Sequence, residues 1–161
     1  MAFPCVVLLS DFGCDGAAAL PGVCKSVNPA LPVYELTHDV PRFDIAAAAA
    51  VLSDQLCAWP EGTVFMCAVD PHFGSGEKVL ACLTADGYTV VGPDNGCLAE
   101  VFRNHGVAEL RALTELNQSY LEQESSAVPH GRNLAYCAAC IAAGTPSFEL
   151  SGELLDVPVN G

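Results

Sequence analysis

The sequence predicts a three-layer α/β fold in which helices flank a mixed, mostly parallel sheet. Short apolar runs typical of buried strands alternate along the chain with segments typical of helices. Two of the later strands are separated by a tight turn, which predicts one hairpin within the sheet. The length of 161 residues suits one domain, because domains typically hold about 100–150 residues. We therefore expect residues 1–161 to form a single α/β domain.

The first half of the sequence predicts three strands and two helices. The apolar run at residues 6–9 ends at a polar loop, which indicates a buried strand. Asn28-Pro29 ends the first helix, because proline cannot continue one. Asp44 is suited to cap the second helix, where a run of alanines supplies helix propensity. The predicted elements are strands at residues 6–9, 32–36 and 63–69, and helices at residues 17–27 and 44–58.

The second half of the sequence predicts a hairpin, a further strand and two helices. Ala85-Asp86-Gly87 separates two strand-like runs and is typical of a hairpin turn. Gly144 is suited to end the last helix, because glycine readily adopts the left-handed conformation. Residues 114–128 are polar, and we expect a loop with a little helix there. The predicted elements are strands at residues 79–84, 88–91 and 108–113, and helices at residues 98–104 and 132–143.

Polar residues follow four of the predicted strands. In sheets of this kind the ligand lies beyond the carboxyl ends of the strands, so we expect a binding site there. Structural alternatives stay open, because Asp11 could cap the next helix and residues 92–96 could form only a turn. The polar residues at these strand ends are Asp11, His38, Asp39, Asp70, Asp94 and Asn95.

The charge balance of the chain is strongly acidic. Six Lys and Arg against 19 Asp and Glu give a net charge of −13. Proteins that bind nucleic acid need a basic surface, so this partner is excluded and anionic membranes are disfavoured. No apolar run approaches the ~20 residues that span a bilayer, and the N-terminus lacks the basic region of a signal peptide. We expect a cytoplasmic protein without nucleic-acid or membrane partners.

The cysteines do not predict a metal or redox site. The chain has nine of them, and several lie within apolar runs, where a cysteine acts as a small buried hydrophobe. Cys137 and Cys140 have a CxxC spacing, but no second CxxC or nearby histidine pair accompanies them. We therefore expect no metal site.

Seven groups of short motifs carry a family resemblance. Each is common by itself, but here they follow one another in a single order along the chain. Together they resemble the S-adenosylmethionine hydroxide adenosyltransferases, which are related to the S-adenosylmethionine-dependent fluorinases and chlorinases. The motifs are Leu9-Ser10-Asp11-Phe12-Gly13, Val27-Asn28-Pro29, Leu36-Thr37-His38-Asp39-Val40-Pro41 with Phe43-Asp44-Ile45, Pro60-Glu61-Gly62-Thr63-Val64, Val69-Asp70-Pro71, Val91-Gly92-Pro93-Asp94-Asn95-Gly96 and His130-Gly131-Arg132-Asn133.

The resemblance implies a nucleoside site with S-adenosylmethionine as the substrate and no cofactor. It implies that Asp11 binds the two ribose hydroxyls and that the Phe43 ring lies against the nucleoside. The other substrate-binding residues that we expect from the matched motifs are Phe12, Asp94, Asn95 and Gly131.

The resemblance also implies a catalytic set for hydrolysis. Asp70 and His130 would belong to an Asp-Arg-His set that orients or deprotonates water, which then attacks C5′ of the ribose. The halogenating relatives carry Tyr at the position of Asp70. The family arginine lies seven positions after the aspartate, where this chain has Glu77. Lys78 follows and could supply a positive charge, without the planar fork of arginine.

The sequence leaves three hypotheses for function, of which the first follows from the family resemblance. The first is hydrolysis of S-adenosylmethionine to adenosine and methionine, impaired here by Glu77 and by the expected absence of the family's C-terminal β-barrel domain. In the family the ligand lies between subunits of a trimer, so we expect a homotrimer. The second is a nucleoside-binding or assembly module without chemistry. The third is a metal-dependent hydrolase that uses Asp11, Asp70, His72 and His130.

Overall fold

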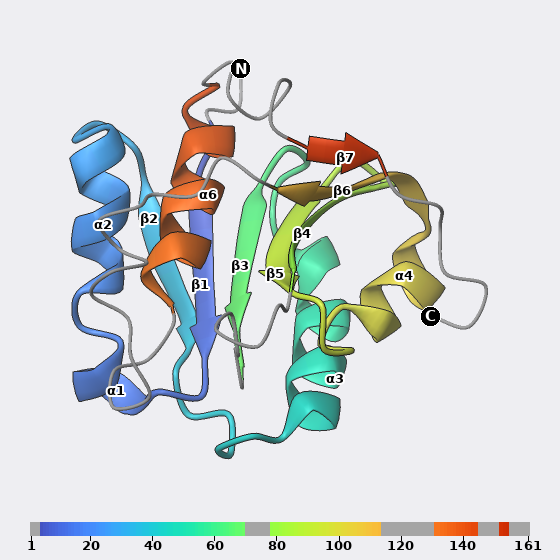
Figure 1. Ribbon diagram of the computed structural model, residues 1–161, viewed down its shortest axis with the longest axis horizontal. Coiled ribbons are helices and arrows are strands. Elements are labelled where there is room, and N and C mark those ends of the chain that lie inside the picture. Colours follow the sequence, from blue (N-terminus) through green and yellow to red (C-terminus); the bar gives the residue numbers. More distant parts are fainter. Residues whose placement is uncertain (1–3, 70–77, 114–130, 145–151, 155–161) are drawn as a thin grey trace.

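The computed structural model is a three-layer α/β fold, as predicted (Figure 1). It describes residues 4–69, 78–113, 131–144 and 152–154, the last group by backbone alone. The predicted loop at residues 114–128 therefore lies outside the described residues.

A seven-stranded sheet forms the middle layer of the described structure, in the order β2-β1-β3-β5-β4-β6-β7. Strands β1, β2, β3 and β5 run parallel, whereas β4 is antiparallel to β5 and to β6, and β7 is antiparallel to β6. The sheet is therefore mixed, with four parallel neighbours on one side. The strands are β1 (Val6–Ser10), β2 (Val33–Thr37), β3 (Val64–Ala68), β4 (Val79–Thr84), β5 (Thr89–Pro93), β6 (Val107–Leu113) and β7 (Gly152–Leu154).

Helices cover both faces of the sheet (Figure 1). Side chains of β1 alternate between the two faces, because successive residues of a strand point to opposite sides. Val6 and Leu8 pack with α2 and α6, whereas Val7 and Leu9 pack toward α3 and α4. The helices are α1 (Gly13–Gly16), α2 (Leu20–Val27), α3 (Ile45–Gln55) with the 3-10 turn η1 (Leu56–Ala58), α4 (Ala99–His105) and α6 (Arg132–Ala142).

Local signals explain where several helices begin and end. The Asp44 side chain accepts a hydrogen bond from Ala47 N–H at 3.0 Å and caps α3, as predicted. Gly144 follows α6 with a φ of 76°, also as predicted. The predicted helix at residues 17–27 is wrong in its first turn, because the chain forms the short helix α1 and then begins α2 at Leu20. Pro21 lies in the first turn of α2, where its missing N–H costs no hydrogen bond.

Strand β7 was not expected from the sequence. It has only three residues and pairs with the end of β6, as Leu113 with Gly152. The helices that the structure describes include none with the length and apolar character needed to cross a membrane.

Candidate functional site

The parallel strands β1, β2, β3 and β5 all end at one edge of the sheet, and Figure 1 shows β1, β2 and β3 pointing toward the bottom. We call this the carboxyl edge. The segments that follow three of these strands, β1, β2 and β5, contain the predicted binding residues Asp11, Phe12, Phe43, Asp94 and Asn95. The fold thus brings together residues that lie far apart in the sequence.

Asp11 connects the end of β1 to the loop that precedes α3. Its carboxylate Oδ2 accepts a hydrogen bond from Phe43 N–H at 2.8 Å. Asp11 is only 3% exposed. The helix that follows, α1, has Phe12 as its N-cap and no side-chain cap, so Asp11 does not cap it. The structural alternative for Asp11 is therefore wrong, and its carboxylate instead holds a loop from another part of the sequence.

Phe43 has an unusual backbone and an exposed ring. Its φ is 65°, in the left-handed region, where a bulky residue is uncommon and strained by about 1–2 kcal/mol. The ring is 60% exposed, with the Arg42 guanidinium 5.1 Å from its centroid. The hydrogen bond to Asp11 holds this strained backbone in place. Such strain is concentrated at ligand sites in proteins.

The loop after β1 is also held by the end of β2. Ser10 Oγ lies 2.6 Å from His38 Nδ1, and it accepts a longer hydrogen bond from Phe12 N–H at 3.3 Å. Gly13 N–H donates to the His38 carbonyl at 2.9 Å. His38 is 7% exposed, and its Nε2 lies 3.3 Å from Glu35 Oε1 without making a hydrogen bond. The sequence singled out His38 only as a polar residue at a strand end and did not predict its pairing with Ser10.

Phe12 and Gly131 are in direct contact. A Cβ added to Gly131 would stand 2.5 Å from Cε2 of Phe12 and 3.2 Å from Cδ2 of Leu20. The Phe12 ring therefore lies against the backbone at the beginning of α6. This contact joins the first and the last of the matched motifs, which are more than a hundred positions apart in the sequence. Glycine is required here for space, since its φ of −93° is one that any residue adopts.

The turn after β5 lies beside the ends of β3 and β4. Asn95 Nδ2 donates to the Val69 carbonyl at 2.9 Å, and Asn95 Oδ1 accepts from Cys97 N–H at 3.2 Å. Asp94 N–H donates to the Lys78 carbonyl at 2.9 Å. Asp94 and Lys78 are both exposed. Gly92 and Pro93 are the last residues of β5, so the turn that the structural alternative expected begins only at Asp94, and it carries two of the predicted binding residues at the carboxyl edge.

Two of the three predicted catalytic residues lie outside the described residues. Asp70 follows Val69 in the sequence, and His130 precedes Gly131; Glu77 and His72 also lie outside the described residues. Among the residues that the structure describes, no three His, Cys, Asp or Glu side chains are placed to hold a metal ion. Because three of the four residues of the metal hypothesis are not described, that hypothesis stays untested.

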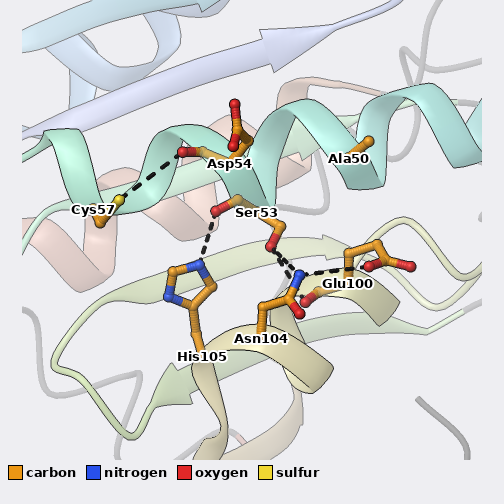
Figure 2. Close-up of a pocket in the computed structure, with 7 residues that line it drawn as sticks. All are labelled: Ala50, Ser53, Asp54, Cys57, Glu100, Asn104 and His105. Carbon is orange, nitrogen blue, oxygen red and sulfur yellow. Dashed lines mark hydrogen bonds between the residues drawn. The ribbon is translucent and has the colours of Figure 1, made fainter.

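A separate hollow of about 430 Å³ lies between α3 and α4 (Figure 2). Its polar groups pair with one another: His105 Nε2 lies 2.8 Å from the Ser53 carbonyl, and Asn104 Nδ2 donates to Ser53 Oγ at 2.9 Å. These pairs join α3 to α4. Their own hydrogen bonds satisfy them, so we do not place the functional site here. The lining residues are Ala50, Ser53, Asp54, Cys57, Glu100, Asn104 and His105.

His105 also connects this hollow to the turn between β4 and β5. Its Nδ1 lies 2.7 Å from Asp86 Oδ2. Burial alone would lower the pKa of His105, but the hydrogen bonds to Asp86 and to the Ser53 carbonyl outweigh it and raise the pKa. Burial alone would raise the pKa of Asp86, and the hydrogen bonds from His105 and Thr84 lower it instead. Because Asp86 lies in the turn before β5, this pair is at the opposite end of β5 from the carboxyl edge.

Comparison with known proteins identifies the family. Residues 6–152 match the family described as the SAM hydroxide adenosyltransferase N-terminal domain, which is most of the chain. The chain belongs to this family. The resemblance read from the motifs is therefore confirmed at the level of the family.

Relatives and a solved structure agree with this assignment. The chain is 37% identical over 147 residues to the (R)-S-adenosyl-L-methionine hydrolase of Salinispora tropica, with 89% of this chain and 55% of the relative covered. It is 25% identical over 178 residues to a fluorinase of Actinoplanes sp., with 95% and 59% covered. The crystal structure of a conserved protein from Thermotoga maritima superposes with a TM-score of 0.82 at 31% identity, with 94% and 59% covered. The chain thus spans little more than half the length of these relatives.

Proposed function

We propose that the carboxyl edge binds the nucleoside part of S-adenosylmethionine. The observation that carries this proposal is the pairing of a buried carboxylate, Asp11, with the backbone of Phe43, whose ring is exposed beside it. A carboxylate can accept hydrogen bonds from two adjacent ribose hydroxyls, and an exposed aromatic ring can cover a purine face. Relatives named S-adenosyl-L-methionine hydrolase and fluorinase act on a ligand of this class, which supports the proposal.

The other edge residues complete the proposed pocket. Phe12 would form an apolar wall, because its ring is held against Gly131 at the beginning of α6. Asp94 and Asn95 would face the ligand from the turn after β5, and Asn95 also fixes this turn to the end of β3. A cationic sulfonium is compatible with the acidic chain, whose net charge of −13 attracts positively charged ligands.

The reaction that we propose is the hydrolysis of S-adenosylmethionine. The oxygen of water attacks C5′ of the ribose as the C5′–sulfur bond breaks, and the bonding electron pair leaves with sulfur to give neutral methionine. Adenosine forms when the attacking water loses a proton, with Asp70 or His130 as the proposed acceptor. The catalytic contribution of the chain is to hold water and C5′ in line.

We propose that turnover by this chain is slow. Glu77 occupies the position of the family arginine, and a second carboxylate near Asp70 would raise the pKa of Asp70 when ionised. Lys78 is placed at the carboxyl edge, with its carbonyl bonded to Asp94, and is the proposed substitute for the missing positive charge. An ammonium group lacks the two-pronged geometry of a guanidinium, so this replacement is incomplete.

Incubation of the chain with S-adenosylmethionine, followed by chromatography for adenosine, tests the hydrolase. We expect slow release of adenosine and methionine in equal amounts, faster release by Glu77→Arg, and slower release by Asp70→Asn. The matched control is Glu61→Arg, which makes the same charge change at an exposed residue in the turn before β3. Equal stimulation by both arginine variants would show that the effect is one of net charge.

The alternative is a nucleoside-binding or assembly module without chemistry. It is favoured by Glu77, the departure from the family pattern. Adenosine binding by a chain that releases no adenosine from S-adenosylmethionine, even as Glu77→Arg, would establish this alternative. The homotrimer and the cytoplasmic location that the sequence led us to expect stay predictions, and light scattering after size-exclusion chromatography tests the first.

A further inference from the structure

We propose that His38 is a positioning residue for the nucleoside site. In this inference His38 is neutral and carries its proton on Nε2, and its Nδ1 accepts the hydroxyl proton of Ser10. The Ser10 oxygen is thereby oriented to receive Phe12 N–H. The inference rests on the proposed function in one respect, because the segment that His38 positions is the one assigned to the nucleoside.

The first step concerns the hydroxyl of Ser10, which is completely buried. A serine hydroxyl has one proton to donate and two lone pairs that accept. Phe12 N–H occupies one lone pair at 3.3 Å, so that bond uses the oxygen as an acceptor. The Ser10 proton then needs an acceptor of its own, and His38 Nδ1 at 2.6 Å is within reach. A buried hydroxyl without a partner for its proton would be costly.

The second step concerns the other ring nitrogen, His38 Nε2. It is buried, and Glu35 Oε1 at 3.3 Å is a carboxylate oxygen, which can only accept when ionised. A proton on Nε2 would be attracted by this nearby negative charge, although the two groups are not aligned as a hydrogen bond, whereas a lone pair on Nε2 would be repelled by it. A ring protonated at both nitrogens would be a buried cation beside a carboxylate that is half exposed. The neutral ring with its proton on Nε2 therefore fits both the Ser10 hydroxyl at Nδ1 and the Glu35 carboxylate beside Nε2.

The third step links His38 to the ligand-facing residues. Ser10, Asp11 and Phe12 are consecutive, so a hydroxyl fixed at Ser10 restricts the backbone of the other two. His38 makes a second hydrogen bond to this segment, because its carbonyl accepts from Gly13 N–H at 2.9 Å. His38, in the loop after β2, therefore holds the segment from Ser10 to Gly13 at both ends. The Asp11 carboxylate and the Phe12 ring are carried by this held segment.

Nuclear magnetic resonance of the ring nitrogens tests the inference on the wild-type chain without any ligand. In protein with ¹⁵N-labelled histidine at neutral pH, we expect the His38 spectrum of the tautomer with Nε2 protonated and Nδ1 unprotonated. Ser10→Ala removes the donor to Nδ1 and should shift the Nδ1 resonance, while His105 serves as the internal control. A wild-type ring with its proton on Nδ1, or on both nitrogens, would overturn the inference.

A pair of substitutions tests the consequence for the site. His38→Asn keeps an amide oxygen near the position of Nδ1, whereas His38→Leu has no acceptor. We expect His38→Leu to lose protection of the Phe12 amide from hydrogen exchange and to bind adenosine about tenfold more weakly, and His38→Asn to retain much of both. The thermal midpoint of each variant shows whether it is folded.

The outcomes separate this inference from the proposed function. If the wild-type chain does not bind adenosine, the proposed function fails. The tautomer of His38 and the hydrogen exchange of the Phe12 amide can still be measured, and they decide the role of His38. If wild-type chain binds adenosine and folded His38→Leu binds it equally well with a protected Phe12 amide, the positioning role is wrong. Equal losses of adenosine affinity and of Phe12 amide protection in His38→Asn and His38→Leu would also contradict the positioning role. The acceptor for the Ser10 hydroxyl would then make no difference.

Discussion

Two histidine networks, at opposite ends of the sheet, use similar residues for different purposes. Ser10, His38 and Glu35 lie at the carboxyl edge, whereas Ser53, His105 and Asp86 join α3, α4 and the turn before β5. Both histidine side chains are nearly buried. In the first network one ring nitrogen has no hydrogen-bond partner among the described residues, while in the second both nitrogens have close partners.

The surroundings of the two networks explain the difference. At the carboxyl edge the hydrogen bonds end on a segment that carries a buried carboxylate and lies beside a strained Phe43. Around His105 they end on a backbone carbonyl and on an exposed carboxylate, and they connect α4 to α3 and to the turn before β5. A serine, a histidine and an acid therefore do not by themselves indicate function. Strained backbone and buried polar groups without a hydrogen bond are better indicators of a functional site. A fold keeps such groups only where neighbouring contacts hold them in place.

The largest effect is expected for Asp11→Ala. The substitution removes the proposed partner of the ribose hydroxyls and the acceptor of Phe43 N–H. Because hydrogen bonds to a charged group contribute about 1.5–3 kcal/mol, adenosine affinity should fall by up to about 100-fold. Isothermal titration calorimetry measures this change. Asp11→Asn keeps an oxygen that can accept the hydrogen bond from Phe43 N–H, so it should lose less adenosine affinity. An unchanged affinity in Asp11→Ala would mean that the nucleoside binds elsewhere.

Gly131→Ala should destabilise the contact between α6 and the loop after β1. The new Cβ would stand 2.5 Å from the Phe12 ring, and overpacking of this kind costs about 1–3 kcal/mol. Gly22→Ala is the matched control, since a Cβ there meets nothing within 4 Å and alanine favours a helix. Denaturation in urea measures the free energy of unfolding of both variants. Equal stability of Gly131→Ala and wild type would mean that Phe12 moves aside at little cost.

Phe43→Gly should separate stability from binding. Glycine adopts the φ of 65° without strain, so we expect the free energy of unfolding to stay equal or rise by about 1 kcal/mol. Loss of the exposed ring should weaken adenosine binding about tenfold, since stacking of a base on an aromatic ring contributes about 1–3 kcal/mol. A variant that is less stable and binds normally would show that Phe43 has only a structural role.

His105→Gln should lower the free energy of unfolding by about 1 kcal/mol, a typical net value for a hydrogen bond, and leave adenosine binding unchanged. The raised pKa of His105 gives stability that is fully present below its ordinary value of 6.5 and lost as the pH rises through the pKa in the folded state. The lowered pKa of Asp86 gives stability that is present above its ordinary value of 3.8 and lost in acid.

The difference in stability between wild type and His105→Gln should therefore be largest between these two pH values. Urea denaturation at a series of pH values measures it. A difference that grows as the solution becomes alkaline would contradict the assigned ion pair.

Much of the fold could be predicted because its signals are local. Apolar runs marked the buried strands, Asp44 marked the start of α3, and the polar residues at strand ends marked the carboxyl edge. Strand β7 gave no such signal, since three residues cannot show alternation, and pairing with β6 alone defines it. The split between α1 and α2 was missed because the sequence pattern did not reveal the turn that separates them.

The contacts of the site were less predictable than its residues. The motifs named Asp11, Phe12, Phe43 and Gly131, but not which of them touch. The bond from Ser10 to His38 joins residues 28 positions apart and depends on the parallel pairing of β1 with β2. The left-handed backbone of Phe43 could not be expected from a phenylalanine, because a tertiary contact with Asp11, 32 positions away in the sequence, helps to hold it.

Titration of ¹⁵N-labelled chain with adenosine, followed by the chemical shifts of its backbone amides, tests the central claim most directly. The account predicts saturable shifts at Phe12, Phe43, Asn95 and Gly131, the residues of the carboxyl edge. It predicts none at Ser53, Asn104 and His105, which line the hollow between α3 and α4. Shifts confined to that hollow, or no saturable shifts at all, would contradict the assignment of the carboxyl edge as the nucleoside site.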